Sequence, residues 1–258
     1  MKKIKQQKLR NIKQNAWVII PTYNEAGNIV QLLEQIFTLQ KEQLSDFVLY
    51  VLVVDDNSPD GTGQHVIDYK KQTKNDYVNL LLREGKRGRG LAGIAGFQYA
   101  LKEGADFIVE MDADFSHDPI HIPALLTKCQ EADVVLGSRF VAGGRTVGRP
   151  LYRNIITTLA NFYIRTILGL HVRDCNSGFR CFKRKVLEHV DLSHFVSEGP
   201  AIVQELLYKA FLKGFVIAEV PIVFKEREEG NSKMGFRSLY KGYMMVLTLK
   251  IARICGRL

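Results

Sequence analysis

Two aspartates separated by one residue, Asp112 and Asp114, directly follow an apolar run at residues 107–111. The run predicts a buried strand, and side chains at i and i+2 of an extended chain point to the same side. Ligands of open α/β sheets bind beyond the carboxyl ends of the strands. Two carboxylates there suit a hard divalent cation, which in turn suits a pyrophosphate. Spacing alone equally allows a second interpretation, in which the aspartates cap a helix that begins near Pro119.

A second acidic pair, Asp55 and Asp56, follows the apolar run at residues 47–54. Acidic residues placed directly after a β-strand are positioned to receive ribose hydroxyls. The residues that follow, 58–61, have the composition of a turn. An ordinary connection between a strand and a capped helix would use the same residues, so both interpretations stay open.

A basic, glycine-rich stretch at residues 83–90 follows a third predicted strand at 78–82. Glycine lets the backbone approach a ligand closely, and lysine and arginine supply positive charge. The stretch contains neither a phosphate loop of the Walker type nor a GxGxxG motif. It is either a loop that contacts a phosphate-bearing ligand, with Lys86 as the candidate contact, or a mobile surface loop.

These segments belong to a regular alternation of strand and helix patterns in the first 140 residues or so. The predicted strands are 16–20, 47–54, 78–82, 107–111 and 133–137, with helical spacing between them. Such alternation predicts an α/β fold with a Rossmann-like, doubly wound, mostly parallel sheet. Because the carboxyl ends of parallel strands share one edge, we expect the acidic residues to gather in one crevice.

The second half of the chain has a different character. We expect amphipathic helices at 151–170 and 238–258, shorter helices at 186–190 and 204–211, and strands at 180–183 and 215–223. A flexible loop is expected at 141–145, and residues 174–180 read as a polar turn before a strand. The predicted domains are a basic N-terminal tail at 1–15, a catalytic domain at 16–237 and a C-terminal amphipathic basic helix at 238–258.

Composition narrows the choice of partners. The chain has 258 residues, 46% of them hydrophobic, which is enough for one well-buried core. Its formal net charge of +9 favours phosphate-bearing partners: nucleic acid, anionic lipid or phosphorylated small molecules. We disfavour nucleic acid because the basic residues lie in separate loops without interleaved aromatic residues.

Several features predict a cytoplasmic protein that associates peripherally with a membrane. The four cysteines form no CxxC pair, as expected for reduced thiols. The N-terminus lacks the apolar core of a secretory signal, and no apolar run approaches the roughly 18–20 residues that span a bilayer. The stripe of Lys250, Arg253 and Arg257 beside an apolar face is typical of helices that lie in a membrane interface. A helix packed on the sheet, or one that binds a partner, would show a similar pattern.

Over about residues 17–235, the chain resembles the family 2 glycosyltransferases of the GT-A fold, and within them the dolichol-phosphate (polyprenol-phosphate) mannosyltransferases. The segments that carry the resemblance are 18–25, 53–62, 111–119, 137–139, 174–180, 219–222 and 227–233. Their order and combination are specific to this family, whereas the first three alone would mark only the wider glycosyltransferase group.

The resemblance implies a set of donor contacts. Residues expected to line the nucleotide-sugar site are Pro21, Tyr23, Glu25, Asp55, Asp56, Lys86, Asp112, Arg227 and Lys233, the last two closing over the phosphates. Asp112 and Asp114 correspond to the pair that holds Mg²⁺ or Mn²⁺. Some relatives have a glutamine ligand where this chain has Ser116, so His117 or water would complete the metal site.

The resemblance also implies an acceptor site. Arg139 corresponds to an arginine next to the sugar and the acceptor phosphate, and Arg153 and Thr157 to contacts with that phosphate. The latter two are four residues apart and therefore share one face of a helix. Membrane-anchored relatives have transmembrane helices after this region. This chain resembles the short form, which relies on small membrane partner subunits or on its own amphipathic helices.

The expected activity is transfer of mannose from GDP-mannose to a polyprenyl (dolichyl) phosphate, metal-dependent and with inversion, which gives a β-linked product. A phosphate monoester is mostly dianionic at pH 7, so it needs cationic positioning more than a strong general base. One alternative is a sister enzyme that uses UDP-glucose or another nucleotide sugar. A phosphatase with a DxD motif would carry its acidic pair after the first strand, not the fourth. A non-catalytic nucleic-acid-binding protein is the third alternative.

Overall fold

The computed structural model describes residues 13–197, 199–226 and 236–256. The elements run in the order β1 (Gln14–Thr22), α2 (Ile29–Gln43), β2 (Phe47–Asp55), α3 (Thr62–Thr73), β3 (Val78–Leu82), α4 (Arg89–Lys102), β4 (Phe107–Glu110), η1 (Pro119–His121), α5 (Ile122–Glu131), β5 (Val134–Ser138), β6 (Arg145–Val147), α6 (Leu151–Leu168), β7 (Arg180–Lys183), α7 (Arg184–His189), η2 (Gly199–Ala201), α8 (Ile202–Leu212), β8 (Ile217–Pro221), β9 (Val223–Lys225) and α9 (Phe236–Ile254).

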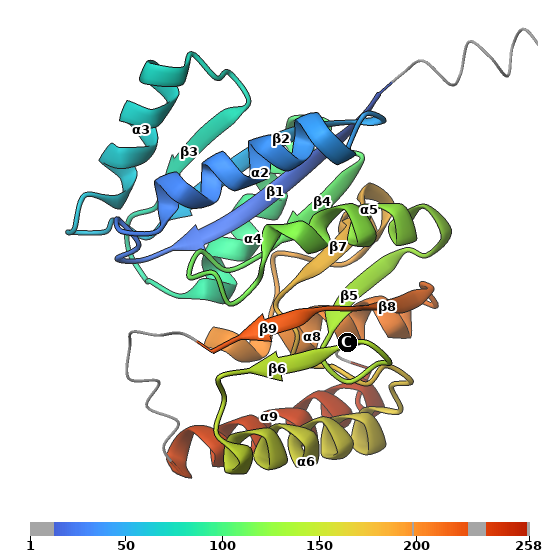
Figure 1. Cartoon of the computed structure of the whole chain (residues 1–258). Coiled ribbons are helices and arrows are strands. Elements are labelled where there is room, and N and C mark those ends of the chain that lie inside the picture. Colours follow the sequence, from blue (N-terminus) through green and yellow to red (C-terminus); the bar gives the residue numbers. More distant parts are fainter. Residues whose placement is uncertain (1–12, 198, 227–235, 257–258) are drawn as a thin grey trace, which may run out of the picture.

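The main sheet has the strand order β3-β2-β1-β4-β7-β5-β8. Neighbouring strands are parallel except at β7, which is antiparallel to both β4 and β5 (Figure 1). The predicted mostly parallel, doubly wound sheet is confirmed. The sequence pattern did not predict that the fourth and fifth parallel strands would be separated by a strand of opposite direction.

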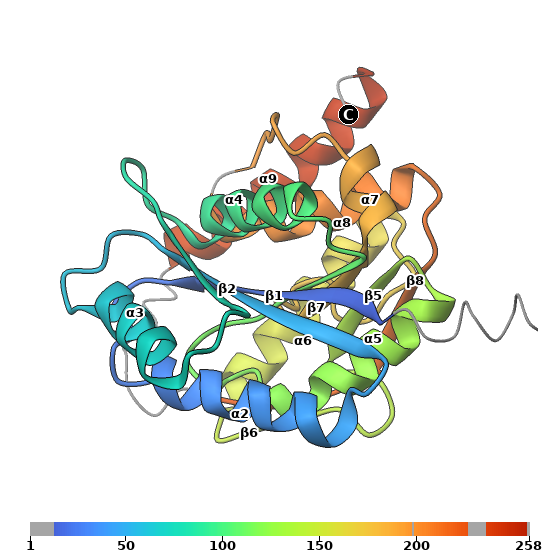
Figure 2. The same cartoon turned by 90° about the horizontal axis from the view of Figure 1, so that it is seen from above.

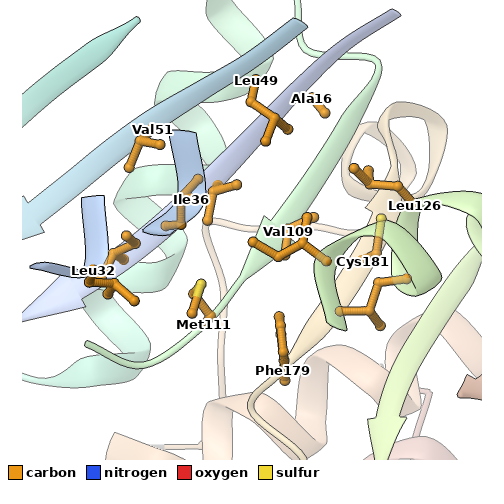
Figure 3. Close-up of a cluster of buried hydrophobic side chains, with 14 of the residues drawn as sticks. Ala16, Leu32, Ile36, Leu49, Val51, Val109, Met111, Leu126, Phe179 and Cys181 are labelled. Atoms are coloured by element: carbon orange, nitrogen blue, oxygen red, sulfur yellow. The ribbon is translucent and has the colours of Figure 1, made fainter. Parts of the chain in front are cut away.

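Helices cover both faces of this sheet, as Figure 2 shows from above. On one face lie α2, α3 and α5, and on the other α4, α7 and α8. Helix α2 forms because its apolar residues recur at helical spacing, and Ile29, Leu32, Leu33 and Ile36 are all fully buried. Figure 3 shows this side of the core, where Leu32 and Ile36 lie near Val51 and Val109 of the sheet.

Helices α6 and α9 lie side by side below the main sheet in Figure 1. The hydroxyl of Tyr163 on α6 donates to the carbonyl of Tyr243 on α9 at 3.1 Å, and the two rings meet edge to face. Ile164 of α6 and Val246 of α9 are buried in the same hydrophobic cluster as α4 and α8. In the described part of the chain, neither these helices nor any other combines the length and apolarity needed to cross a bilayer.

The predicted strand at 215–223 is two strands. Strand β8 ends at Pro221, and β9 then pairs with β6 in a separate parallel ribbon. Proline has no amide hydrogen to donate, so Pro221 is a natural place for the chain to leave β5. The loop expected at 141–145 accordingly ends in the first residue of β6.

The antiparallel strand β7 has a consequence for the site. Parallel strands β1, β2, β4, β5 and β8 all end at one edge of the sheet. Because β7 runs the other way, the turn that precedes it, at residues 174–179, reaches that same edge. Ligand sites of open sheets lie at such an edge.

Candidate active site

A cavity of about 220 Å³ lies at this edge of the sheet. It is lined by Arg89, Asp112, His117, Arg139, Asn176, Ser177, Gly178, Val203, Ile222 and Phe224. The structure thus brings together Asp112, which follows β4, and Arg139, which follows β5. Asp114 does not line the cavity and lies half-buried in the turn beside it.

The turn after β4 is held by its own polar side chains. Ser116 donates from its backbone N–H and from its hydroxyl to Asp114 Oδ1, at 3.0 and 2.6 Å. The backbone N–H of Asp112 donates to His117 Nδ1 at 3.0 Å. Ser116 therefore orients Asp114 in this structure.

His117 is buried and stacks on Phe179, with 5.1 Å between ring centroids. Burial lowers the pKa of His117 to about 4, so the ring is neutral at pH 7. Because Nδ1 already accepts a hydrogen bond, the ring proton of the neutral form is on Nε2. A metal ligand needs a free lone pair, and in this bonding pattern neither ring nitrogen offers one. The pattern therefore counts against the predicted role of His117 as a third metal ligand.

The acidic pair fits a hard divalent cation that arrives with a substrate. In the ranges that the structure describes, no three His, Cys, Asp or Glu side chains cluster closely enough to hold a metal by themselves. Mg²⁺ is commonly bound through one or two carboxylates together with waters and substrate phosphates. Asp112 and Asp114 supply that smaller donor set.

Arg89, the first residue of α4, is a cavity residue to which sequence reasoning assigned no role. Its Nε donates to Asp112 Oδ1 at 2.5 Å, and Nη1 lies 3.5 Å from Glu110 Oε1. The two carboxylates raise the pKa of the Arg89 guanidinium, although burial acts against them. The basic composition of residues 83–90 was the only signal in the sequence, because the carboxylate partners belong to another element.

Arg139 is held by Asp174, from the turn before β7. Its Nε and Nη2 donate to the two carboxylate oxygens at 2.8 and 2.7 Å, a bidentate geometry. The guanidinium carbon also lies 5.1 Å from the ring centroid of Phe224. Asp174 is fully buried, so the wall of the cavity fixes the position of Arg139.

Two further arginines lie beside Arg139. Arg149 Nε is 3.1 Å from Glu226 Oε2, and Arg153 on α6 forms an ion pair with the other oxygen of the same carboxylate. Burial lowers the pKa of Arg149; Glu226 opposes this, while Arg139 and Arg153 act in the same direction as burial. We call Arg139, Arg149 and Arg153 the arginine cluster.

Arg149 was not among the residues predicted from the sequence. Thr157 was predicted to act with Arg153, and both are on α6. The Thr157 hydroxyl donates to the Arg153 carbonyl at 2.9 Å. Its predicted contact with an acceptor phosphate is therefore a proposal that requires this hydroxyl to change partner.

The acidic pair at the end of β2 is buried, and both carboxylates accept hydrogen bonds from the surrounding turns. Asp55 accepts hydrogen bonds from the Thr22 hydroxyl and the Ser58 backbone N–H, each at 3.0 Å. Asp56 accepts one from the Gly88 N–H at 2.7 Å and forms an ion pair with Arg83. The pair thus ties the end of β1 and the basic loop to the end of β2.

The other predicted donor contacts lie around the same strand ends. Pro21 is next to the last residue of β1, and the Glu25 carboxylate accepts from Asn28 Nδ2 at 2.8 Å. The exposed ring of Tyr23 lies 4.6 Å from the guanidinium carbon of Arg87, which also donates to the Tyr23 hydroxyl. Lys86 is exposed in the basic loop. The predicted contacts Arg227 and Lys233 lie outside the described residues.

Asp112, Arg89 and Arg139 meet at one cavity at the carboxyl ends of the strands, an arrangement that is typical of proteins that bind phosphate-bearing ligands. Comparison with known proteins identifies the family. Residues 17–191 match the family described as "Glycosyl transferase family 2", and the chain belongs to this family. It is a glycosyltransferase.

Two relatives match most of the chain. "Polyprenol monophosphomannose synthase" of Mycolicibacterium smegmatis is 40% identical over 222 residues, which are 86% of this chain and 81% of the relative. "Undecaprenyl-phosphate mannosyltransferase" of Micrococcus luteus is 41% identical over 216 residues, 84% of this chain and 86% of the relative.

Solved structures include glucosyl-3-phosphoglycerate synthase from Mycobacterium tuberculosis in complex with Mn²⁺, UDP and phosphoglyceric acid. The TM-score is 0.67 at 18% sequence identity, and the match covers 98% of this chain and 82% of that one. At this identity the likeness shows the fold alone, and it confirms the predicted GT-A type.

Proposed function

We propose that this glycosyltransferase transfers mannose from GDP-mannose to a polyprenyl (dolichyl) phosphate at a membrane surface. The names of the two relatives at about 40% identity support a polyprenyl-phosphate mannosyltransferase. The observation that carries the proposal is the arginine cluster, of which Arg139 lines the same cavity as Asp112. Arginines of this kind suit a phosphate acceptor, because a guanidinium matches the geometry of phosphate oxygens.

On the donor side, Asp112 and Asp114 are the residues that would hold Mg²⁺ or Mn²⁺. Such an ion, when bound, stabilises the charge that develops on the leaving nucleoside diphosphate. The strand ends near Tyr23 and Asp56, with the basic loop around Lys86, form the proposed nucleotide side of the site. Arg227 and Lys233 complete the proposed set.

On the acceptor side, a phosphate monoester is its own nucleophile. Its second pKa is near 6, so at pH 7 it is mostly dianionic and needs no strong base. The buried His117 is tied to the Asp112 backbone and is not required as one. Arg139, held by Asp174, would fix one side of the incoming phosphate. We propose a single in-line displacement with inversion, which forms the β-linked sugar phosphate.

Helices α6 and α9 each present exposed apolar side chains, which we propose lie in the lipid surface. These residues are Leu151, Tyr152, Ile155, Leu159 and Phe162 on α6, and Met244, Leu247, Ile251 and Ile254 on α9. They recur at helical spacing, so each helix offers one apolar stripe. Lys250 and Arg253 add positive charge for anionic headgroups.

The position of α6 links this surface to the acceptor site. Arg153 lies in its first turn, next to the exposed Leu151 and Tyr152. A lipid phosphate at the membrane surface would therefore approach the arginine cluster from the exposed end of this helix. In this arrangement residues 16–237 form the catalytic domain, 238–258 form a membrane-contact helix, and small membrane subunits would add to the attachment.

Replacement of one metal-binding carboxylate tests the proposal. We expect Asp114→Asn to reduce metal-dependent transfer of mannose to polyprenyl phosphate by about 100-fold or more, because electrostatic stabilisation of a leaving group contributes several kcal/mol. The measurement is extraction of labelled lipid product, with and without a chelator.

The matched control is Asp118→Asn, the same substitution in the same turn. Asp118 caps η1 through the Ile120 N–H and pairs with Lys225, and it does not line the cavity. We expect its activity within about twofold of the wild type, by analogy with other surface substitutions. Unchanged turnover in Asp114→Asn would contradict the metal role.

A further inference from the structure

Arg89 occupies the carboxylate that the proposed metal ion would use. Its Nε donates a charge-assisted hydrogen bond to Asp112 Oδ1. Both groups line the same cavity, with only about a quarter of the Arg89 side chain and a fifth of the Asp112 side chain exposed. A cation of the protein is therefore already bound at the first aspartate.

The Arg89 guanidinium is held by contacts with two further elements. Nη2 donates to the carbonyl of Gly178 at 3.3 Å, and Nη1 faces the buried Glu110. A Cβ atom on residue 178 would lie 2.4 Å from Arg89 Nη2 and 3.0 Å from its Cζ. The absence of a side chain at Gly178 is thus what lets the guanidinium approach the turn before β7 so closely.

The charged groups around the Arg89 guanidinium include two carboxylates and a second guanidinium. Glu110 and Asp112 supply two carboxylates, and Arg89 and the fully buried Arg180 supply two guanidinium groups that interact with Glu110. A divalent cation added to this group would face Arg89 at short range, where like charges repel strongly in a partly buried site. A nucleoside diphosphate would bring the negative charge that offsets the repulsion.

We propose that Arg89 is a built-in competitor of the metal ion for Asp112. The competition keeps the affinity of the free protein for the metal alone low. It also couples metal binding to binding of the donor, because the negative charge of the donor offsets the repulsion between Arg89 and the metal ion. By linkage, the metal ion strengthens donor binding by the same factor. The inference rests on the proposed function, in which Asp112 and Asp114 hold the ion.

The test measures Mn²⁺ affinity by electron paramagnetic resonance, without nucleotide and without turnover. We expect Arg89→Met to bind Mn²⁺ at least tenfold more tightly than the wild type. The matched control is Arg87→Met, which removes the same charge from the same loop. Arg87 pairs with Tyr23 instead of Asp112, and we expect its Mn²⁺ affinity within twofold of the wild type.

A second variant displaces the Arg89 guanidinium without removing it. Gly178→Ala keeps Arg89 but places a methyl group where the guanidinium now lies, and the flexible end of the arginine side chain can move away. We expect this variant also to bind Mn²⁺ more tightly. It decides the question if thermal melts show that Arg89→Met does not fold.

Repeating the Mn²⁺ titration in the presence of GDP measures the coupling between metal binding and nucleotide binding. In the wild type GDP should strengthen Mn²⁺ binding by a larger factor than in Arg89→Met. If Asp114→Asn weakens Mn²⁺ binding but Arg89→Met and Gly178→Ala bind as the wild type does, the competition is overturned and the metal site stands. If Asp114→Asn binds Mn²⁺ as the wild type does, the metal site itself is wrong, and the competition falls with it.

Discussion

At the scale of single residues, the Arg139–Asp174 pair shows how the cavity keeps a charged side chain in place. Asp174 is fully buried, and its carboxylate accepts hydrogen bonds from the Arg139 side chain and from the Arg139 backbone N–H. Its own backbone N–H donates to Glu219 at 2.9 Å. Buried pairs of this kind are costly to break, because the remaining partner becomes an uncompensated charge.

We therefore expect Asp174→Asn to lower the free energy of unfolding by about 3 kcal/mol or more. Urea denaturation followed by circular dichroism measures the change. The control is Glu131→Gln, which breaks the exposed ion pair with Lys128 and should leave the unfolding midpoint nearly unchanged. Equal midpoints for Asp174→Asn and the wild type would show that Asp174 does not support the fold in this way.

Only some residues of the candidate site could be predicted from the sequence. Asp112 and Arg139 were selected, because strand ends and the family resemblance point to them. Arg89 and Arg149 were not, since their importance depends on partners from other elements: Asp112 for the first and Glu226 for the second. A charged residue in a glycine-rich loop has the same pattern whether or not the fold brings a carboxylate to it.

At the scale of elements, the regular part of the fold was predictable and the inserted strand was not. Strand β3 and strand β7 have their predicted bounds. The direction of β7 could not be predicted. A strand of four residues can pair with its neighbours in either direction, and the sequence pattern indicates only that it is a strand. Its direction nevertheless places Gly178 at the cavity and Asp174 against the cavity residue Arg139.

The pair of helices α6 and α9 gives a prediction at this scale. Phe162 is 67% exposed on the apolar stripe of α6, and an aromatic side chain buried in lipid contributes about 1.5–3 kcal/mol. We expect Phe162→Asp to weaken binding to anionic phospholipid vesicles by about tenfold or more. Co-sedimentation with the vesicles measures the affinity.

Tyr77→Asp is the matched control for this surface. Tyr77 is also exposed, but it precedes β3, at the opposite edge of the sheet from β8. Its replacement should leave vesicle binding as in the wild type. Equal binding by all three proteins would mean that the α6 stripe does not meet the membrane.

At the scale of the whole molecule, one edge of the sheet connects three sets of groups. The ends of β1 and β2, with the basic loop, form the proposed nucleotide side. The turn after β4 carries the proposed metal ligands. Within the arginine cluster, Arg139 lines the cavity, Arg153 lies in the first turn of α6, and Arg149 shares Glu226 with Arg153. Helix α6 lies side by side with α9 (Figure 1). In the proposed function, these sets would bind, in this order, the nucleotide donor, the metal ion and the phosphate at the lipid surface.

The most direct test of this account offers the wild-type protein a choice of donors. Purified protein is incubated with vesicles that contain polyprenyl phosphate, and with equal concentrations of GDP-mannose and UDP-glucose that carry different labels. We predict that the mannose label enters the lipid fraction, that a chelator prevents this, and that the product is the β-linked polyprenyl-phosphate mannose. Glucose label in the lipid fraction, or no lipid product at all, would contradict the proposed function.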